Sequence, residues 1–262
     1  MFSEERKEKI LDFVEQRKAV KVTELSELLQ ISEVTVRRDL DELHNEKKLV
    51  RTHGGAIALK HDRYDLPWVE QAVRQIGEKQ KIARSAFRYI SDNDVILMDD
   101  SSTVQELAKL VASSKFQNLT VVTISIPVVN ILLTNKDIHV IIVGGAIDPG
   151  MNSVLGGMVS RMLSEMSADK CFLGINGVQE DGSFSTVCYE QMTTKKMILG
   201  TARQRFILAD HTKFGHSAFV KVEKAAGGVD FLITDKRIAG FDYSGLEDSL
   251  NLVVSEDEEE NG

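Results

Sequence analysis

Residues 23–59 carry the pattern that most restricts what this chain can fold into. Two short segments with helical spacing of apolar residues are separated only by Gln30 and Ile31, which leaves room for nothing but a tight turn. Thr23 is expected to cap the first helix and Ser32 the second, because a hydroxyl can accept an unpaired amide at a helix start. The apolar positions of the first helix are Leu25, Leu28 and Leu29.

Two apolar runs follow the second helix, over residues 49–52 and 56–59, with the sequence His-Gly-Gly between them. Glycine turns between such runs are typical of β-hairpins. A helix over residues 3–16 should pack beneath these elements, and a short strand over residues 20–22 should pair with the hairpin. The pattern therefore predicts a helix-turn-helix followed by a wing.

The second helix presents two different faces when residues are spaced at about 100°. Val36, Leu40 and Leu43 share one face and are expected in the core. Val34 and Arg38 lie opposite, where an arginine that can fork onto guanine and a methyl that can meet thymine suit the major groove. The residues predicted to contact DNA are Ser32, Val34, Thr35, Arg37, Arg38, Arg51 and His53.

Arg37 lies at the edge of this face and is better placed for phosphate than for a base. Helix spacing alone leaves open a helical hairpin whose two arginines are solvated surface charges. The wing and the capped turn together favour a DNA-binding domain over this alternative.

The run ISEVTVRRDLDEL followed by LVRTHGGA resembles the amino-terminal signature of the DeoR family of bacterial transcriptional regulators. The resemblance continues at MDDSST, VVT, IIVGGAI, KCFLGINGV and ADHTKFG, and so covers nearly the whole chain. It implies a winged helix-turn-helix that binds operator DNA, joined to a carboxy-terminal effector domain that senses a phosphorylated sugar. It also implies repression as the commoner mode of control.

The formal net charge of −8 is unevenly divided along the 262 residues. Residues 1–60 hold 12 Lys+Arg and 12 Asp+Glu, which leaves 20 and 28 for the remainder. Because the first domain is neutral, non-specific binding should be weak, and specific affinity should rest on a few placed arginines and on dimerisation. We therefore expect a homo-oligomer, either a dimer or a tetramer.

Cysteine content and hydropathy exclude several other classes of protein. The two cysteines, Cys171 and Cys188, are far apart and have no metal-ligand spacing, so reduced thiols and no metal or cofactor are expected. No apolar run reaches membrane length, and the amino terminus is charged and helical instead of signal-like. These features predict a cytoplasmic protein.

Four regions follow from the pattern: a DNA-binding domain over residues 1–59, a linker over 60–76 that contains Trp68, an α/β domain over 77–254, and an acidic disordered tail over 255–262. In the α/β domain, short β-branched runs alternate with helical stretches, which predicts a mostly parallel sheet with helices on both faces. The strands are expected at 95–98, 120–123, 140–143, 171–175, 206–209 and 231–234, and the helices near 78–90, 103–113, 127–134, 157–166 and 190–203. By the family resemblance, this domain is similar in fold to sugar-phosphate isomerases.

Polar and glycine residues follow most of these strands. The carboxyl ends of parallel strands meet at one edge of a sheet, which is the usual ligand site. The residues predicted to bind an effector there are Asp100, Ser101, Ser102, Thr103, Ser125, Gly144, Gly145, Asn176, Gly177 and Lys213. The start of a helix at residues 101–103 suits a phosphate group, although Ser-Ser-Thr is also an ordinary helix cap. The resemblance implies that Asp100 holds sugar hydroxyls and that Lys213 supplies a charge near the ligand.

A sugar-phosphate isomerase fused to a DNA-binding domain is the competing interpretation. Asp169, Glu190, Asp210 and Lys213 are the residues that would supply acid or base groups. Because the pocket is joined to a domain that binds operator DNA, sensing of a sugar phosphate explains it better than catalysis does. The sequence therefore favours a regulator over an enzyme.

Overall fold

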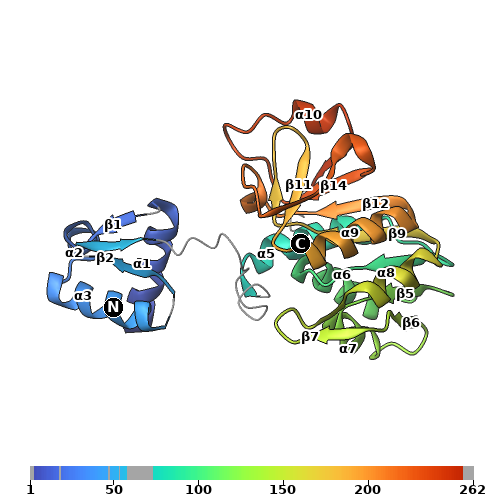
Figure 1. Ribbon diagram of the computed structural model, residues 1–262, viewed down its shortest axis with the longest axis horizontal. Helices are drawn as coiled ribbons and strands as arrows, with labels where there is room; N and C mark the ends of the chain where they lie inside the picture. The colour runs from blue at the N-terminus through green and yellow to red at the C-terminus, as the bar shows by residue number, and fades with distance from the viewer. Residues whose placement is uncertain (1–2, 18, 47, 53, 58–72, 256–262) are drawn as a thin grey trace, which may run out of the picture. The chain divides into compact units, whose positions relative to one another are not determined.

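The computed structural model describes residues 3–17, 19–46, 48–52, 54–57 and 73–255. The chain divides into two compact units, Met1–His61 and Asp62–Gly262 (Figure 1). Three predicted features lie wholly or largely outside the described residues: His53, the linker with Trp68, and the acidic tail.

The first unit is the predicted winged helix-turn-helix. Its elements are α1 (Ser3–Arg17), β1 (Ala19–Lys21), α2 (Val22–Leu29), α3 (Glu33–Asn45), β2 (Val50–Thr52) and β3 (Gly55–Ile57). The strands form an antiparallel sheet in the order β1-β3-β2, so the strand before α2 pairs with the wing as predicted. Val36, Leu40 and Leu43 of α3 are fully buried beside Ile10, Leu25 and Leu49, which confirms the predicted core face.

Two local predictions in this unit differ in outcome. Ser32 caps α3 by accepting the Thr35 amide at 3.2 Å, as expected. Thr23 is not a cap: α2 begins at Val22, and Lys21 is the N-cap, with its amide donating to the Glu24 carboxylate at 3.0 Å. Of the three apolar positions named for this helix, Leu28 is 45% exposed. An eight-residue helix buries too narrow a stripe to hold three leucines.

The second unit is built on a seven-stranded sheet that is parallel throughout. The strands are β4 (Val95–Met98), β5 (Thr120–Thr123), β6 (His139–Ile142), β9 (Ala168–Gly174), β12 (Ala202–Leu208), β14 (Phe231–Thr234) and β15 (Asn251–Val254). Their order is β15-β14-β12-β9-β4-β5-β6. Six of the seven were predicted from sequence, and β15 was not.

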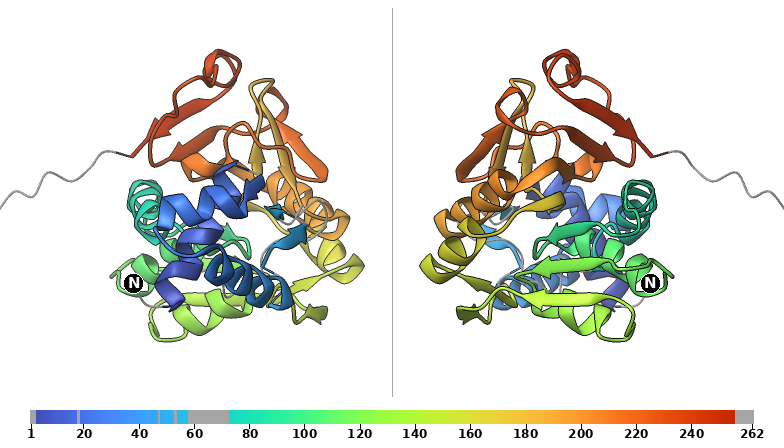
Figure 2. Two further views of the ribbon diagram at one scale, coloured as in Figure 1. Left: turned by 90° about the vertical axis from the view of Figure 1, so that its left-hand side faces the viewer. Right: turned by 90° about the vertical axis from the view of Figure 1, so that its right-hand side faces the viewer.

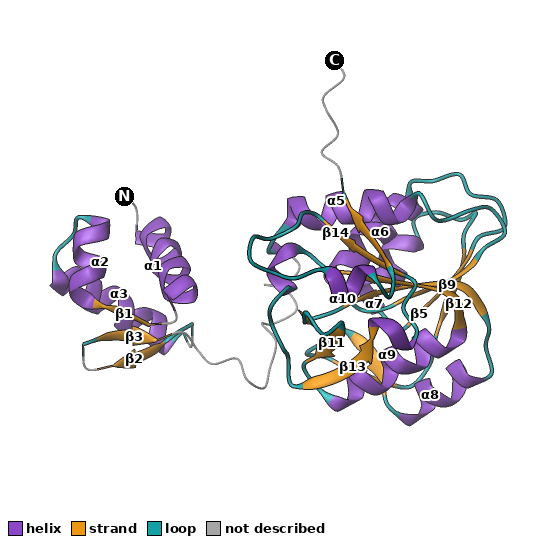
Figure 3. Ribbon diagram, turned by 90° about the horizontal axis from the view of Figure 1, so that it is seen from above, coloured by secondary structure: helices purple, strands orange, loops and turns teal. Residues whose placement is uncertain are grey.

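Helices cover both faces of this sheet. On one face lie α5 (Ile76–Phe87), α6 (Ser102–Ala112) and α7 (Ile126–Leu132), and on the other α8 (Gly157–Ser164) and α9 (Tyr189–Thr201), with α10 (Ser244–Glu247) near the end of the chain. Figure 3 shows the two layers on either side of the strands, and the right-hand view of Figure 2 separates α5 from α8 in the same way. Within the described residues, no helix is long and apolar enough to cross a membrane.

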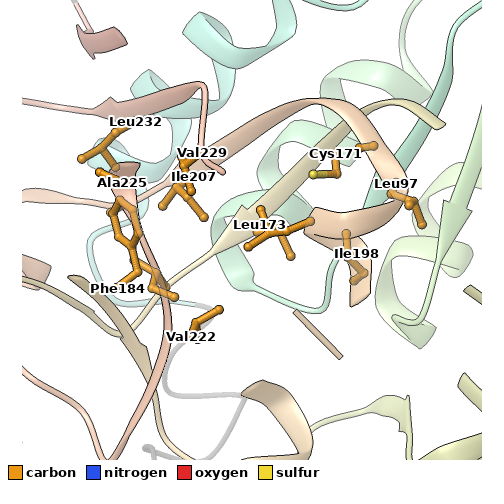
Figure 4. Close-up of a cluster of buried hydrophobic side chains, with 14 of the residues drawn as sticks. Leu97, Cys171, Leu173, Phe184, Ile198, Ile207, Val222, Ala225, Val229 and Leu232 are labelled. Atoms are coloured by element: carbon orange, nitrogen blue, oxygen red, sulfur yellow. The ribbon is translucent and has the colours of Figure 1, made fainter. Parts of the chain in front are cut away.

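Successive side chains along each strand point alternately into two cores, one on either face of the sheet. Ile96 and Met98 pack under α5, α6 and α7, whereas Leu97 points to the opposite side. Figure 4 shows this second core, in which Ile198 of α9 lies over Leu97, Cys171 and Leu173 of the sheet. Because both faces are buried, the strands read as continuous apolar runs.

Smaller elements lie in the connections between these strands, and the sequence did not predict them. They are the hairpin β7 (Ala146–Asp148) and β8 (Ser153–Leu155), the antiparallel sheet of β10 (Gly177–Val178), β11 (Ser183–Thr186) and β13 (Val220–Lys224), and the 3-10 turns η1 (His211–Lys213) and η2 (Ala225–Gly227). Strands of two to five residues are too short to show a period.

Strand order reverses between β4 and β9. The chain runs outward from β4 through β5 to β6, then returns to β9 on the other side of β4 and continues to β12, β14 and β15. In an open parallel sheet, the carboxyl ends of the two strands at such a reversal border the ligand crevice. The loops after β4 and β9 are therefore the first place to look for a site.

Candidate DNA interface and ligand site

The recognition helix α3 exposes the face that the sequence predicted. Val34 is 73% exposed, and the side chains of Arg37 and Arg38 are more than half exposed. Arg37 pairs with Glu33 at 2.6 Å and Arg38 with Glu42 at 3.8 Å. Surface pairs of this kind are weak, so both guanidinium groups can exchange their carboxylates for DNA.

The other predicted DNA contacts differ in their surroundings. The Ser32 and Thr35 hydroxyls lie 2.9 Å apart at the start of α3. The Arg51 side chain is only 18% exposed: its Nε donates to Asp41 at 3.0 Å, and its NH1 donates to the carbonyls of Thr52 and Gly55. Arg51 thus braces the wing against α3 in this structure, and direct contact with DNA stays a prediction.

A buried ion pair that sequence reasoning missed holds α3 against α1. Arg6 Nε lies 2.5 Å from Asp39 Oδ2, and its second nitrogen lies 3.0 Å from Oδ1. Asp39 is fully buried. The signal was present in the sequence, because Asp39 falls on the same helix face as Val36 and Leu43, where a carboxylate needs a cation.

The reversal between β4 and β9 contains a second buried ion pair, formed by Asp99 and Lys195. Lys195 Nζ of α9 lies 2.5 Å from Asp99 Oδ2 and 3.1 Å from the Gly174 carbonyl. Asp99 also accepts the amides of Ser101 at 2.9 Å and Gly174 at 3.0 Å. A Cβ on Gly174 would lie 2.2 Å from the Ser101 Cβ, so only glycine lets the two loops approach this closely.

Asp100 is the second carboxyl of this cluster. It is buried, with Oδ1 3.9 Å from Lys195 Nζ. Burial raises the pKa of Asp100 and the Asp99 charge adds to the rise, whereas Lys195 and the hydroxyl of Ser153 lower it. Burial dominates, so this site disfavours the ionised carboxyl.

The start of α6 keeps two amides available beside Asp100. Ser101 is the N-cap, and its hydroxyl accepts the Val104 amide at 3.3 Å. Within the described part of the chain, the amides of Ser102 and Thr103 have no acceptor. Ser125 likewise caps α7 by accepting the Val128 amide at 3.4 Å. The hydroxyls of Ser101 and Ser125 therefore serve as ordinary caps, while the amides after Ser101 can receive an anion.

The remaining predicted effector residues surround this cluster at different depths. Asn176 and Gly177 follow β9, and the Asn176 side chain accepts the Thr186 hydroxyl at 3.0 Å. Gly145 packs against Val154 of β8, one residue from Ser153, and Gly144 precedes it after the edge strand β6. Lys213 ends η1, after β12 on the far side of β9.

Lys79 is a buried cation at the same edge that the sequence did not reveal. It lies near the start of α5 and is 5% exposed. Burial lowers its pKa to about 8, while Asp210 and Glu106 raise it and Lys213 and Arg74 lower it further. Lys79 and Lys213 therefore form a region of positive charge at the strand ends, shared with two carboxylates.

A groove of about 660 Å³ borders the cluster without including its carboxylates. Gln105 and Glu106 of α6, Ile126 of α7 and Asn152 before β8 contribute to its walls. Gln105 also donates to the Asp100 carbonyl at 3.4 Å, so the groove and the buried carboxyls share one wall.

Of the four residues proposed for an enzyme, Asp210 and Lys213 lie near Lys79 at this edge of the sheet, and Asp169 does not. Asp169 accepts the Val95 amide at 2.9 Å, at the start of β4 and so at the opposite edge of the sheet. Glu190 is exposed in the first turn of α9. Asp210 is buried as the cap of η1, where it accepts the Thr212 amide at 3.0 Å.

Comparison with known proteins matches both units. A model described as the DeoR-like helix-turn-helix domain matches residues 6–62, and one described as the DeoR C terminal sensor domain matches residues 74–236. The HTH-type transcriptional repressor GlcR of Bacillus subtilis is 34% identical, over 99% of each chain. The glycerol-3-phosphate regulon repressor of Escherichia coli is 32% identical, over 86% of this chain and 88% of its own.

Among solved structures, ribose 5-phosphate isomerase A of Methanocaldococcus jannaschii is 17% identical over 52% of this chain and 53% of its own, with a TM-score of 0.38.

Proposed function

This chain belongs to the DeoR family of DNA-binding transcriptional regulators, and we propose that it represses a carbohydrate-utilisation operon and leaves its operator when a phosphorylated sugar intermediate binds the second domain. Names of relatives support the class of regulated genes: one is a glycerol-3-phosphate regulon repressor and another, in Staphylococcus epidermidis, a lactose phosphotransferase system repressor. The regulator class also displaces the isomerase alternative.

The observation that carries the choice of effector is the start of α6. Its Ser102 and Thr103 amides lack acceptors within the described residues and lie where the strand order reverses. Amides at a helix start, together with the helix dipole, favour a phosphate group. The buried Asp100 carboxyl beside them suits the hydroxyl groups of the same molecule. A phosphate ester of a sugar or polyol carries both groups.

Release from the operator requires the ligand to bind one arrangement of the protein better than the other. A phosphorylated sugar that joins the loops at Asp100 to those at Gly144 and Lys213 ties several strand ends together. Coupling between a ligand and a second site is commonly about 1–3 kcal/mol, or roughly 5-fold to 150-fold in affinity. The same change in operator affinity is expected here.

The protein acts as at least a dimer, held together through its second domain. A single winged module with a neutral charge balance binds weakly, and two-fold operators match two-fold proteins. Sedimentation of the full chain at micromolar concentration is expected to give a dimer or tetramer. A monomer that still binds operator tightly would contradict this part of the proposal.

Hexose, pentose and polyol phosphates, screened beside their unphosphorylated parents, test the effector assignment. The thermal shift of the protein and its release from operator are measured together. A phosphate ester should produce both signals and its parent sugar neither. Ser102→Ala and Lys213→Ala should weaken the response but retain operator binding in the absence of ester. If no ester changes either signal the effector class is wrong, and if an ester is converted to product the isomerase alternative returns.

A further inference from the structure

Ser153 occupies a defined position in the hairpin arm that closes over the end of β5. It forms an antiparallel bridge with Ser125. On either side, the Ile126 amide donates to the Asn152 carbonyl at 3.0 Å, and the Val154 amide donates to the Ile124 carbonyl at 2.8 Å. Backbone pairing therefore fixes Ser153 opposite the cap of α7, and the residue is fully buried.

The Ser153 hydroxyl is an exception to the rule that buried polar groups are paired. Among the residues described, its Oγ is the one buried side-chain nitrogen or oxygen that makes no hydrogen bond of acceptable distance and angle, although it lies close enough to the Asp100 carboxyl to lower the pKa of that group. Its bridge partner offers a direct contrast, because Ser125 is equally buried and its hydroxyl accepts the Val128 amide. An unpaired buried hydroxyl lowers stability, so its presence in a well-ordered strand indicates that a bound ligand supplies its hydrogen-bond partner.

The surroundings of the hydroxyl indicate what that partner is. The hydroxyl lies close to the Asp100 carboxyl, and Asp100 comes shortly before the unpaired amides that begin α6. A hydroxyl can both donate and accept, and a carboxyl accepts or, when protonated, donates. A ligand hydroxyl placed between them would satisfy both groups, whereas an apolar ligand atom would leave both unpaired.

We propose that Ser153 contacts the hydroxyl-bearing carbon chain of the effector and, with Asp100, makes the β7–β8 hairpin the part of the second domain that distinguishes one phosphate ester from another. This inference rests on the proposed function and adds a specificity-determining residue to its site. The α6 amides recognise the phosphate, which every candidate ester shares. Ser153 recognises the polyol portion, by which the esters differ.

Ser153→Ala tests the proposal because its two expected effects have opposite signs. Without ligand, its Tm should equal or exceed that of wild type, since the substitution removes an unpaired hydroxyl. Its affinity for the tightest ester found among glycerol 3-phosphate, glucose 6-phosphate and fructose 1-phosphate should fall about 10-fold, typical of one lost hydrogen bond. Any affinity for inorganic phosphate should remain unchanged, because phosphate has no polyol portion.

Two serine variants serve as controls. Ser125→Ala removes a hydroxyl that does have a partner and should lower Tm without ligand. Ser164→Ala, at an exposed position on α8, should change neither Tm nor ester affinity.

The outcomes separate this inference from the proposed function. If wild type and Ser153→Ala bind the ester equally, Ser153 is not a contact, although the effector class stands. If Ser153→Ala loses Tm as Ser125→Ala does, its role is structural and the inference is overturned. If wild type binds none of the three esters or the wider panel, the proposed function fails first and this inference fails with it.

Discussion

Replacing Arg6 by methionine should unfold the DNA-binding domain while leaving the second domain folded. The substitution keeps most of the side-chain volume but removes the cation that pairs with Asp39 through two contacts, at 2.5 and 3.0 Å. Asp39 is fully buried on the inner face of α3, so its carboxylate would be left without a cation in an apolar core.

The magnitude follows from the burial of the pair. Breaking a buried ion pair by removing one partner costs about 3–5 kcal/mol. A domain of about 60 residues has a free energy of unfolding of roughly 3–9 kcal/mol, and small domains lie toward the lower end. The loss is therefore comparable with the whole stability of the unit that carries α3.

Hydrogen exchange of the full chain, read by mass spectrometry, reports each unit separately. A loss of about 3 kcal/mol corresponds to a fall in protection of roughly 100-fold or more, because 1.4 kcal/mol is a factor of ten. Peptides from α2 and α3 should show this fall, and peptides from the central sheet should not. Operator affinity should fall in proportion to the fraction of folded DNA-binding domain.

A double variant separates the ion pair from simple packing. Arg6→Met with Asp39→Leu removes both charges and should recover most of the protection, because apolar replacement of a buried pair is often neutral or stabilising. Arg17→Met is the matched control, since Arg17 is half exposed and lies 3.9 Å from Glu24. Unchanged protection in Arg6→Met, or a double variant as unstable as the single, would refute the reasoning.

Three further predictions concern single residues. Arg38→Ala should lower specific operator affinity by about 1–3 kcal/mol and relax sequence preference, whereas Arg37→Ala should weaken all duplexes alike and reduce the salt slope by about one; titrations on operator and random DNA at several salt concentrations decide this. A thiol reagent should label half-buried Cys188 well before Cys171, whose pKa burial raises strongly, and peptide mass mapping reads the order. The pKa of Lys79 is about 8 in the folded chain, against 10.5 for an ordinary lysine, so between pH 8 and 10.5 the unfolded chain binds more protons than the folded chain. The free energy of unfolding should therefore rise with pH over this range, and it should rise less in Lys79→Gln, as measured by denaturant titration.

The parts of the fold that local chemistry determines were predictable from sequence. The Ser32 cap, the buried face of α3 and the central strands each follow from residues close together in the chain. The Thr23 cap was wrong because a competing local interaction, the Lys21 amide with Glu24, begins α2 two residues earlier. Strand β15 was missed because its side chains are only half-buried and it follows the other strands at the edge of the sheet.

The candidate site was predictable only where it follows strand ends. Asp100 and Ser101 could be named because they come directly after an apolar strand. Lys195 is brought to Asp99 across 96 positions of sequence, and the strand that places Ser153 close to Asp100 is too short to show a period. A lysine on the same helix face as the buried Ile198 and Leu199 was the one available signal for Lys195.

Asp100→Asn should make the protein more stable at neutral pH and less responsive to its effector. Burial raises the pKa of Asp100 in the folded chain, so folding disfavours the ionised carboxyl, and the free energy of unfolding falls as pH rises from 3.8 through the folded pKa. Asparagine has nearly the same shape and no charge to desolvate, while Lys195 keeps Asp99 as its partner. A residue retained despite this cost is expected to serve binding, because perturbed carboxyls gather at functional sites. Denaturant titrations at several pH values should show the wild-type slope disappear in Asp100→Asn, and operator release by the active ester should weaken. A variant that is less stable at pH 7 but fully responsive would mean that Asp100 holds the loops together and does not contact the effector.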